Sequence, residues 1–211
     1  ARPRLVAGGA DEVLPDDTPA GDLIRVIRLL RPAAALAEPQ PAARVVAVTG
    51  PPGAPGRTEV ALALAWAWAE HHQVILLDLD GDAPALAVRL GRPPRPDLVD
   101  AAEAVHETGA LPPRAVAACG PLGLVVGSTR RGDADVPPHL VADVAAAAGA
   151  LAEVLVLDVG ARRGEDPLVK GADEVVLVAE ASPLGLVRAA RLVADWAGPH
   201  PRLILNRVHR P

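Results

Sequence analysis

The chain has 211 residues, half of them hydrophobic, with a formal net charge of −5, one cysteine, three tryptophans, and no Phe, Tyr or Met. This length suits one α/β domain with a sizeable core, while the scarcity of aromatics and the negative charge argue against nucleic-acid and anionic-lipid surfaces. The single Cys119 excludes an internal disulfide and no apolar run of about 18 residues indicates a membrane span, so we expect a soluble cytoplasmic protein.

The N-terminal part of the chain differs in pattern from the rest. Residues 11–15 are typical of a strand and residues 20–30 of an amphipathic helix, while the Pro- and Ala-rich residues 32–43 have the composition of a linker. One strand and one helix cannot bury a core alone. We therefore expect residues 1–31 to be a fragment of another domain or to dock on a main domain over 44–211.

From residue 44 onward, apolar runs alternate with stretches of helix-forming composition. The expected strands are 44–49, 74–80, 122–127, 153–158, 173–180 and 202–206, and the expected helices are 58–72, 96–107, 138–152 and 183–197. Nearly continuous Val, Ile and Leu strands between helices are typical of a parallel sheet covered on both faces. Right-handed crossovers bring the carboxyl ends of such strands to one edge, where ligands bind.

Four of the expected strands end in residues that suit a binding site. These residues are Gly50, then Asp78 with Asp80, then Asp158, and finally Asn206. Each acid taken alone is equally well explained as a solvated strand end. Their joint placement on one sheet edge favours a site.

The segment "GPPGAPGRT", residues 50–58, lies between the first strand and the first long helix. Gly53 and Gly56 allow the backbone to curl around an anion, which the N–H groups at a helix N-terminus attract. Thr58 is placed to ligate Mg²⁺ through its hydroxyl. The full pattern G-x-x-x-x-G-K-[ST] is not met, because its first glycine position holds a proline and its lysine position holds Arg57.

These segments resemble the ParA/MinD group of deviant-Walker P-loop ATPases, and within it the CpaE-like proteins of pilus assembly. "VVAVTGPPGAPGRTEVALALA" is similar to the group's strand, loop and helix, whose loop reads K-G-G-x-G-K-T. "VILLDLDGDAPALAVRLG" resembles its second acidic strand, "EVLVLDVG" its Walker B strand, "ADEVVLVAEASPLGLVRAARLV" the strand and helix that follow, and "LILNRV" its base-contacting asparagine strand. The resemblance runs from about Arg44 to Val208. Residues 1–31 also resemble the end of a receiver-type domain, which precedes the ATPase in CpaE-like proteins.

The resemblance implies a three-layer P-loop NTPase fold with a mostly parallel sheet, and it implies ATP and Mg²⁺ as cofactors. Mg²⁺ would be held by Thr58 and by Asp158. Asp80 matches the second acid of the group's D-x-D strand, which orients the attacking water, and Asn206 would contact the adenine edge. The implied nucleotide-binding set is Gly53, Ala54, Gly56, Arg57, Thr58, Asp78, Asp158 and Asn206.

Both lysines of the group's loop are missing here. Pro52 and Arg57 hold their positions, and the only lysine of the chain is Lys170. Proline cannot reach a partner subunit's phosphates in an ATP-bound dimer, and the planar fork of arginine is not a compact ammonium. Pro55 removes a backbone N–H from the loop, and Ala54 would be strained if its position needs a positive φ. We expect nucleotide binding weakened by about tenfold to a thousandfold, with hydrolysis weaker still.

Two functions stay open at this level. One is an ATPase switch that dimerises around ATP and positions pilus-assembly or division-site (septum) machinery. The alternative is a non-enzymatic pseudo-ATPase scaffold that acts through protein contacts, which the missing lysines and three loop prolines favour. An unrelated α/β interaction domain would make the five similar segments a coincidence.

Two further features bear on the site. Arg162 and Arg163 follow Asp158 and are either replacement cations near the phosphates or part of a surface loop. The chain ends soon after the asparagine strand, so we expect a C-terminally short domain whose adenine side is incompletely walled.

Overall fold

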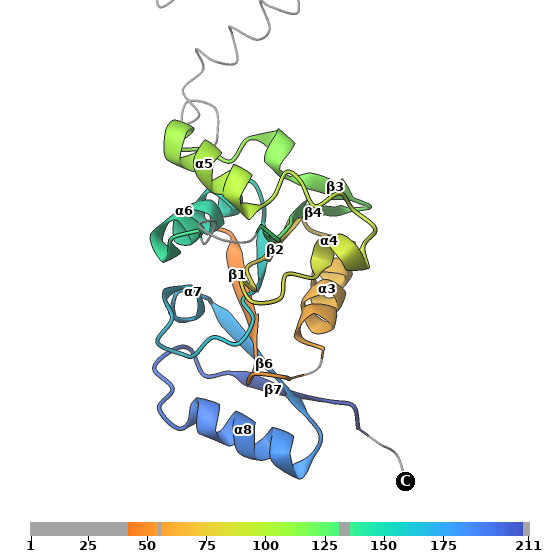
Figure 1. Ribbon diagram of the computed structural model, residues 1–211, viewed down its shortest axis with the longest axis vertical. Helices are drawn as coiled ribbons and strands as arrows, with labels where there is room; N and C mark the ends of the chain where they lie inside the picture. Colours follow the sequence, from red (N-terminus) through yellow and green to blue (C-terminus); the bar gives the residue numbers. More distant parts are fainter. Residues whose placement is uncertain (1–41, 55, 131–135, 209–211) are drawn as a thin grey trace, which may run out of the picture. The chain divides into compact units, whose positions relative to one another are not determined.

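The computed structural model describes residues 42–54, 56–130 and 136–208. Within these ranges the chain forms a three-layer α/β fold around a seven-stranded sheet of order β3-β4-β2-β5-β1-β6-β7 (Figure 1). The strands are β1 (Arg44–Thr49), β2 (Val74–Asp78), β3 (Ala117–Cys119), β4 (Leu122–Val125), β5 (Val154–Asp158), β6 (Glu174–Glu180) and β7 (Arg202–Asn206). The helices are α3 (Arg57–Trp68), α4 (Leu86–Arg89), α5 (Leu98–Thr108), α6 (Pro138–Gly149), α7 (Pro167–Lys170) and α8 (Pro183–Val193), with a 3-10 turn η1 (Pro113–Ala115).

The predicted parallel sheet is confirmed, with one exception at its edge. β1 pairs with β5 and β6, β2 with β4 and β5, and β6 with β7, all in parallel. β3 runs antiparallel to β4, which the sequence did not predict. Because the other strands are parallel, the segments that follow β1, β2 and β5 all start from one edge of the sheet.

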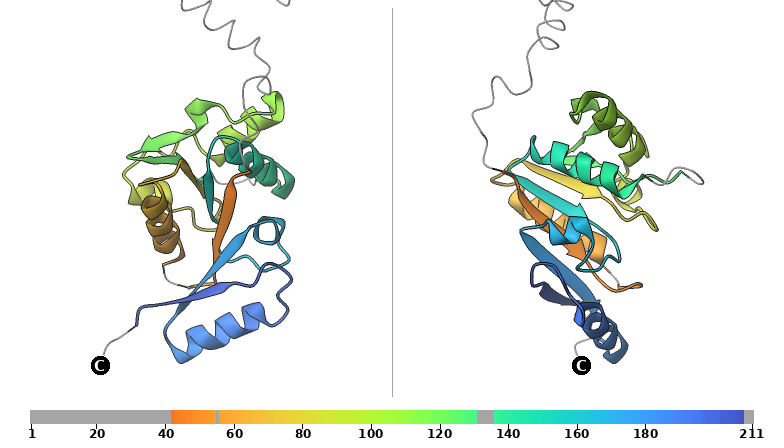
Figure 2. Two further views of the ribbon diagram at one scale, coloured as in Figure 1. Left: turned by 180° about the vertical axis from the view of Figure 1, so that it is seen from behind. Right: turned by 90° about the vertical axis from the view of Figure 1, so that its left-hand side faces the viewer.

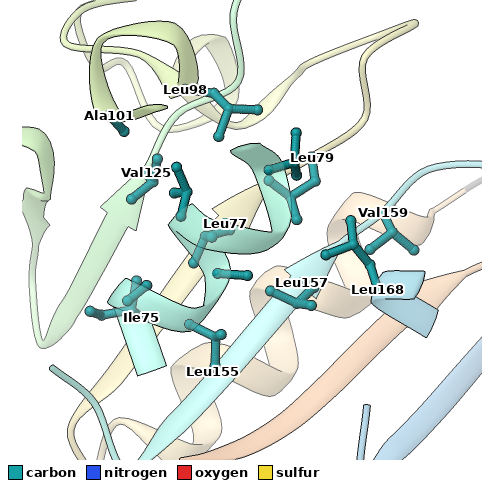
Figure 3. Packing of buried hydrophobic residues seen from close by; sticks show 14 of the residues in the cluster. Ile75, Leu77, Leu79, Leu98, Ala101, Val125, Leu155, Leu157, Val159 and Leu168 are labelled. Carbon is teal, nitrogen blue, oxygen red and sulfur yellow. The ribbon is translucent and has the colours of Figure 1, made fainter. Parts of the chain in front are cut away.

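Successive strand residues pack on opposite faces of the sheet, as the two-residue repeat of a strand requires. On one face, Leu77 and Leu157 belong to a buried cluster that includes residues of α5, α6 and α7 (Figure 3). On the other face, Leu76 and Val156 pack with residues of α3 and α4. Figures 1 and 2 show these helices as layers on either side of the sheet. Burial on both faces explains why the strands are almost entirely apolar.

Several expected boundaries differ from the observed ones. The helix expected over 58–72 ends at Trp68, after which the N–H groups of His71 and His72 both bond to the Trp68 carbonyl as the chain turns toward β2. Asp97 caps α5 by accepting from the Val99 and Asp100 N–H groups, so this helix starts two residues later than expected. No helix in the described ranges is long and apolar enough to cross a membrane. The predicted fragment 1–31 and all but the end of the predicted linker 32–43 lie outside the described residues.

Two helical glycines should respond in opposite ways to alanine. A Cβ on Gly185 of α8 would lie 2.3 Å from the Glu180 carbonyl oxygen, so Gly185→Ala must push α8 away from β6. A Cβ on Gly149 of α6 would make an ordinary 3.6 Å contact with Ala43. We expect Gly185→Ala to lower the free energy of unfolding by about 1–3 kcal/mol, and Gly149→Ala to raise it by about 0.5–1 kcal/mol. Urea unfolding of both variants checks this, and equal effects would contradict the close α8–β6 packing.

Candidate functional site

The loop between β1 and α3 has the backbone of an anion-binding turn. Gly53 and Gly56 adopt left-handed conformations, with φ of 74° and 89°, which favour glycine. Among the described residues, the only non-glycine with a positive φ is Arg207, so the strain considered for Ala54 does not arise. Pro55 lies outside the described residues, and its expected loss of a donor stays a prediction. The curl of the loop therefore needs no lysine to form.

Arg57, the first residue of α3, turns its guanidinium back into this loop. Its Nη1 donates to the carbonyl oxygens of Gly50 at 3.3 Å and Pro51 at 3.0 Å. Its Nη2 donates to Oδ2 of Asp80 at 3.2 Å. The side chains of Arg57 and Asp80 are only 14% and 8% exposed, so water screens this ion pair weakly. Arg57 thus supplies a positive charge for a phosphate, but the carboxylate of Asp80 already neutralises this charge and two carbonyl oxygens already accept its hydrogen bonds.

Asp80 is held from several sides. While Oδ2 accepts from Arg57, Oδ1 accepts from the backbone N–H groups of Asp82 and Ala83, both at 3.2 Å. The loop after β5 closes against the same carboxylate, because a Cβ on Gly160 would lie 2.7 Å from the Asp80 Cγ. Both carboxylate oxygens of the candidate catalytic acid are therefore engaged.

Asp78 and Asp158 lie side by side at the ends of β2 and β5, where they are register partners. Asp78 Oδ2 accepts from the N–H groups of Ala85 and Leu86 at 2.9 Å each. Asp78 Oδ1 and both oxygens of Asp158 are buried without a hydrogen bond of normal geometry in the described part of the chain. Such carboxylates are costly unless a cation neutralises them.

Burial is the main cause of a raised pKa at both aspartates. It raises the pKa of Asp78 to about 6, with a further contribution from the charge of Asp158, while the Leu86 and Ala85 N–H groups act against it. Burial also raises the pKa of Asp158, although the nearby Thr58 hydroxyl and the Arg57 charge favour its ionised form. The two acids are thus poised to take up either a proton or a cation.

These residues fit Mg²⁺ and a phosphate group. Asp158 offers two buried oxygens without a hydrogen bond of normal geometry in the described part of the chain, and the hydroxyl of Thr58 is near enough to favour its ionised form. The described residues contain no group of three His, Cys, Asp or Glu that could hold a metal by itself. Mg²⁺ usually keeps several waters and takes its other ligands from substrate phosphates, so one or two protein ligands suffice.

Two polar residues connect the loop after β5 to the rest of the site. The hydroxyl of Thr49, at the end of β1, donates to the Arg162 carbonyl at 2.7 Å and accepts from the Arg162 N–H at 3.2 Å. The Arg162 guanidinium pairs with Asp166 at 2.7 Å, so this arginine is not a spare cation for phosphate. Sequence reasoning missed Thr49, although a polar residue at the end of a buried strand was a usable signal.

Asn206, the last residue of β7, lies against the loop. Its Nδ2 is 2.2 Å from the place that a Cβ on Gly56 would occupy, and its Oδ1 accepts from the Arg207 N–H at 2.8 Å. Gly56 is therefore required both by its backbone conformation and by this contact. The structure brings Asn206 beside the start of α3, and its predicted contact with adenine stays a prediction.

Comparison with known proteins identifies the fold. No protein-family model and no curated protein matches the sequence. Among solved structures, a ParA family ATPase from Chlorobium tepidum TLS is similar with 23% identity and a TM-score of 0.69, over 79% of this chain and 75% of that one. The septum site-determining protein MinD of Pyrococcus horikoshii OT3, complexed with Mg-ADP, has 19% identity, a TM-score of 0.64 and coverages of 78% and 70%. The cobyrinic acid a,c-diamide synthase of Mycobacterium smegmatis, with bound ADP and magnesium, has 18% identity, a TM-score of 0.53 and coverages of 76% and 72%.

The chain therefore has the three-layer fold of ParA- and MinD-type P-loop NTPases, as its sequence predicted. The same fold also serves a biosynthetic synthase, so the fold does not decide the function by itself.

The raised pKa of Asp78 makes the stability of the protein depend on pH. The unfolded chain loses this proton near pH 3.8 and the folded chain near pH 6, so the contribution of Asp78 to stability falls as the pH rises through this window. We expect Asp78→Asn, which keeps an acceptor for Ala85 and Leu86 without the charge, to remove this dependence. In EDTA the variant should gain about 2–3 kcal/mol over the unmodified protein between pH 4 and pH 7.

Urea unfolding across that pH range measures the difference. Asp143→Asn, which removes an exposed carboxylate from α6, is the matched control and should leave the pH dependence unchanged. A parallel pH dependence of stability for Asp78→Asn and the unmodified protein would contradict the burial of a charged Asp78.

Proposed function

We propose that this protein binds Mg·ATP at the loop between β1 and α3 and acts mainly through binding, with hydrolysis weak or lost. Its role would be to position or regulate cell machinery of the pilus-assembly or division-site kind. That role is inferred from the resemblance to the ParA/MinD group and its CpaE-like branch. The fold shared with a ParA family ATPase and with MinD supports it.

The observation that carries the proposal is the buried carboxylate of Asp158, which has no hydrogen bond of normal geometry within the described residues and lies beside the left-handed glycine loop. An anion-binding turn and a cation-seeking acid are brought together at one sheet edge, with Thr58 close to the acid. Mg²⁺ bound to a nucleotide phosphate satisfies both, because the metal neutralises the acid while the loop receives the phosphate. Mg²⁺ would supply charge stabilisation of the phosphate groups.

Weak hydrolysis follows from the position of Arg57 and Asp80. Phosphoryl transfer depends on positioned charges, and the guanidinium of Arg57 is already occupied by two carbonyls and by Asp80. Both oxygens of Asp80 already accept hydrogen bonds, which leaves this carboxylate less acceptor capacity to orient a water. Each rearrangement adds to the barrier of a step that relies on preorganised groups.

The second candidate is a scaffold that never takes up nucleotide. The same ion pair favours it, since Arg57 and Asp80 neutralise each other without a ligand. In either case we propose a cytoplasmic protein with protein partners. An ATP-dependent homodimer belongs to the first candidate alone.

Replacing Arg57 tests the nucleotide site directly. Lysine carries a compact charge that cannot bridge two carbonyls and a carboxylate as a planar fork does. We expect Arg57→Lys to bind Mg·ATP about tenfold more tightly and to gain measurable turnover, and Arg57→Ala to bind at least about tenfold more weakly than the unmodified protein. Isothermal calorimetry and phosphate release measure the two effects.

Arg114→Lys, in η1 at the far edge of the sheet, is the matched control and should change neither quantity. Absence of binding heat up to millimolar Mg·ATP in the unmodified protein and in Arg57→Lys would refute nucleotide binding and leave the scaffold. Binding without turnover in both proteins would favour nucleotide sensing over catalysis.

A further inference from the structure

Beside the phosphate loop lies a cavity of about 350 Å³ that is lined by three exposed arginines. We propose that it binds a small-molecule oligophosphate group, at a site distinct from the loop interior that Arg57 occupies. The cavity is bounded by the loop prolines Pro51 and Pro52, by Ala161 and Leu192, and by Arg163, Arg188 and Arg191.

The three arginines come from two elements that converge on the phosphate loop. Arg188 and Arg191 are three residues apart on α8 and therefore share one face of that helix. Arg163 lies in the loop after β5. The Nη1 of Arg188 is 3.7 Å from the place that a Cβ on Gly53 would occupy, so its guanidinium reaches the loop backbone. The cavity thus adjoins the phosphate loop without containing Arg57 or Asp158.

These arginines have no acidic partner in the part of the chain that the structure describes. The other arginines near the site do have partners: Arg57 pairs with Asp80, and Arg162 pairs with Asp166. Within the described residues, none of the three guanidinium groups forms a hydrogen bond or ion pair, even though Asp195 is four residues after Arg191 on the chain. Three like charges around one cavity repel one another, and an anion between them turns that repulsion into attraction.

The geometry and chemistry of the cavity favour phosphate groups. The planar fork of arginine matches the oxygens of phosphate, with two parallel N–H donors for each group. A volume of about 350 Å³ is at the lower end of small-ligand pockets, which span about 300–1,000 Å³, and exceeds what one phosphate needs. The prolines and Leu192 add an apolar wall, against which an organic part of the ligand can pack. Three charges together with this volume fit two or more linked phosphates.

Pyrophosphate is the probe, and calorimetry at low ionic strength is the measurement. We expect one pyrophosphate to bind each chain, with an affinity that falls as salt is added. Arg188→Gln and Arg163→Gln should each weaken binding by about ten- to a hundredfold, since each removes a charge-assisted hydrogen bond. Arg114→Gln, which removes an exposed charge at the far edge of the sheet, should leave the affinity unchanged.

A further variant distinguishes binding in this cavity from binding in the phosphate loop. Arg57→Gln, whose side-chain amide can still donate to the carbonyl of the cavity residue Pro51, should preserve pyrophosphate binding while it alters Mg·ATP binding, so the proposed nucleotide function and this site can fail independently. If pyrophosphate binding is lost in Arg57→Gln and kept in Arg188→Gln, the probe binds in the loop and the proposal is wrong. No binding to the unmodified protein, or an equal loss in Arg114→Gln, also overturns it.

The oligophosphate can be a free molecule or the phosphate tail of a nucleotide. Adding Mg·ATP to the pyrophosphate complex separates these sources. Displacement in the unmodified protein, together with weaker Mg·ATP binding in Arg188→Gln, assigns the cavity to a nucleotide tail. Simultaneous binding assigns it to a free oligophosphate.

Discussion

The guanidinium of Arg57 holds the phosphate loop in the conformation described here. It joins the end of β1, through the carbonyls of Gly50 and Pro51, to Asp80 beyond the end of β2. Asp80 in turn contacts Gly160 after β5, so three loops that leave the same sheet edge meet around one ion pair. Because this pair is mostly shielded from water, breaking it without replacing one partner is costly. A bound phosphate would give Arg57 an anionic partner in place of Asp80.

The parallel sheet imposes a second constraint on the site. Its register places Asp78 opposite Asp158 on the same face of the sheet, and both side chains are buried. The fold therefore keeps two acids close together in a poorly solvated place, where burial raises the pKa of each. At neutral pH the two ionised carboxylates lower the stability of the folded protein, and a bound cation would offset this cost. The two acids therefore favour a metal ion that arrives with a phosphate ligand.

The sequence predicted most of the fold, because six strands are apolar runs of five residues or so between long helical stretches. It did not predict α4 and α7, because a four-residue helix is too short for periodicity to reveal. β3 was missed because "AAC" has little strand propensity, and its pairing with β4 is decided by tertiary contacts.

The location of the site could be predicted from the sequence, whereas most of the hydrogen bonds and ion pairs within it could not. The strand-end residues Asp78, Asp80 and Asp158 do meet at one sheet edge, as parallel topology requires. The direction of the Arg57 side chain could not be read from the sequence, since it depends on the curvature of the loop. The pairing of Arg162 with Asp166 was not predictable from their four-residue spacing, because such pairs face each other on a helix and these residues lie in the loop before α7. The convergence of Arg163 with Arg188 depends on how α8 packs on β6, which no local pattern records.

The proposed nucleotide binding requires Arg57 to exchange its contact with Asp80 for a nucleotide phosphate. The most direct test is a crystal structure of the protein with Mg²⁺ and a non-hydrolysable ATP analogue. The account predicts the analogue in the loop between β1 and α3, the Arg57 guanidinium within hydrogen-bond distance of a phosphate oxygen, and Mg²⁺ near Thr58 and Asp158. An intact Arg57–Asp80 pair in crystals grown at saturating analogue, with no nucleotide at the loop, would contradict it.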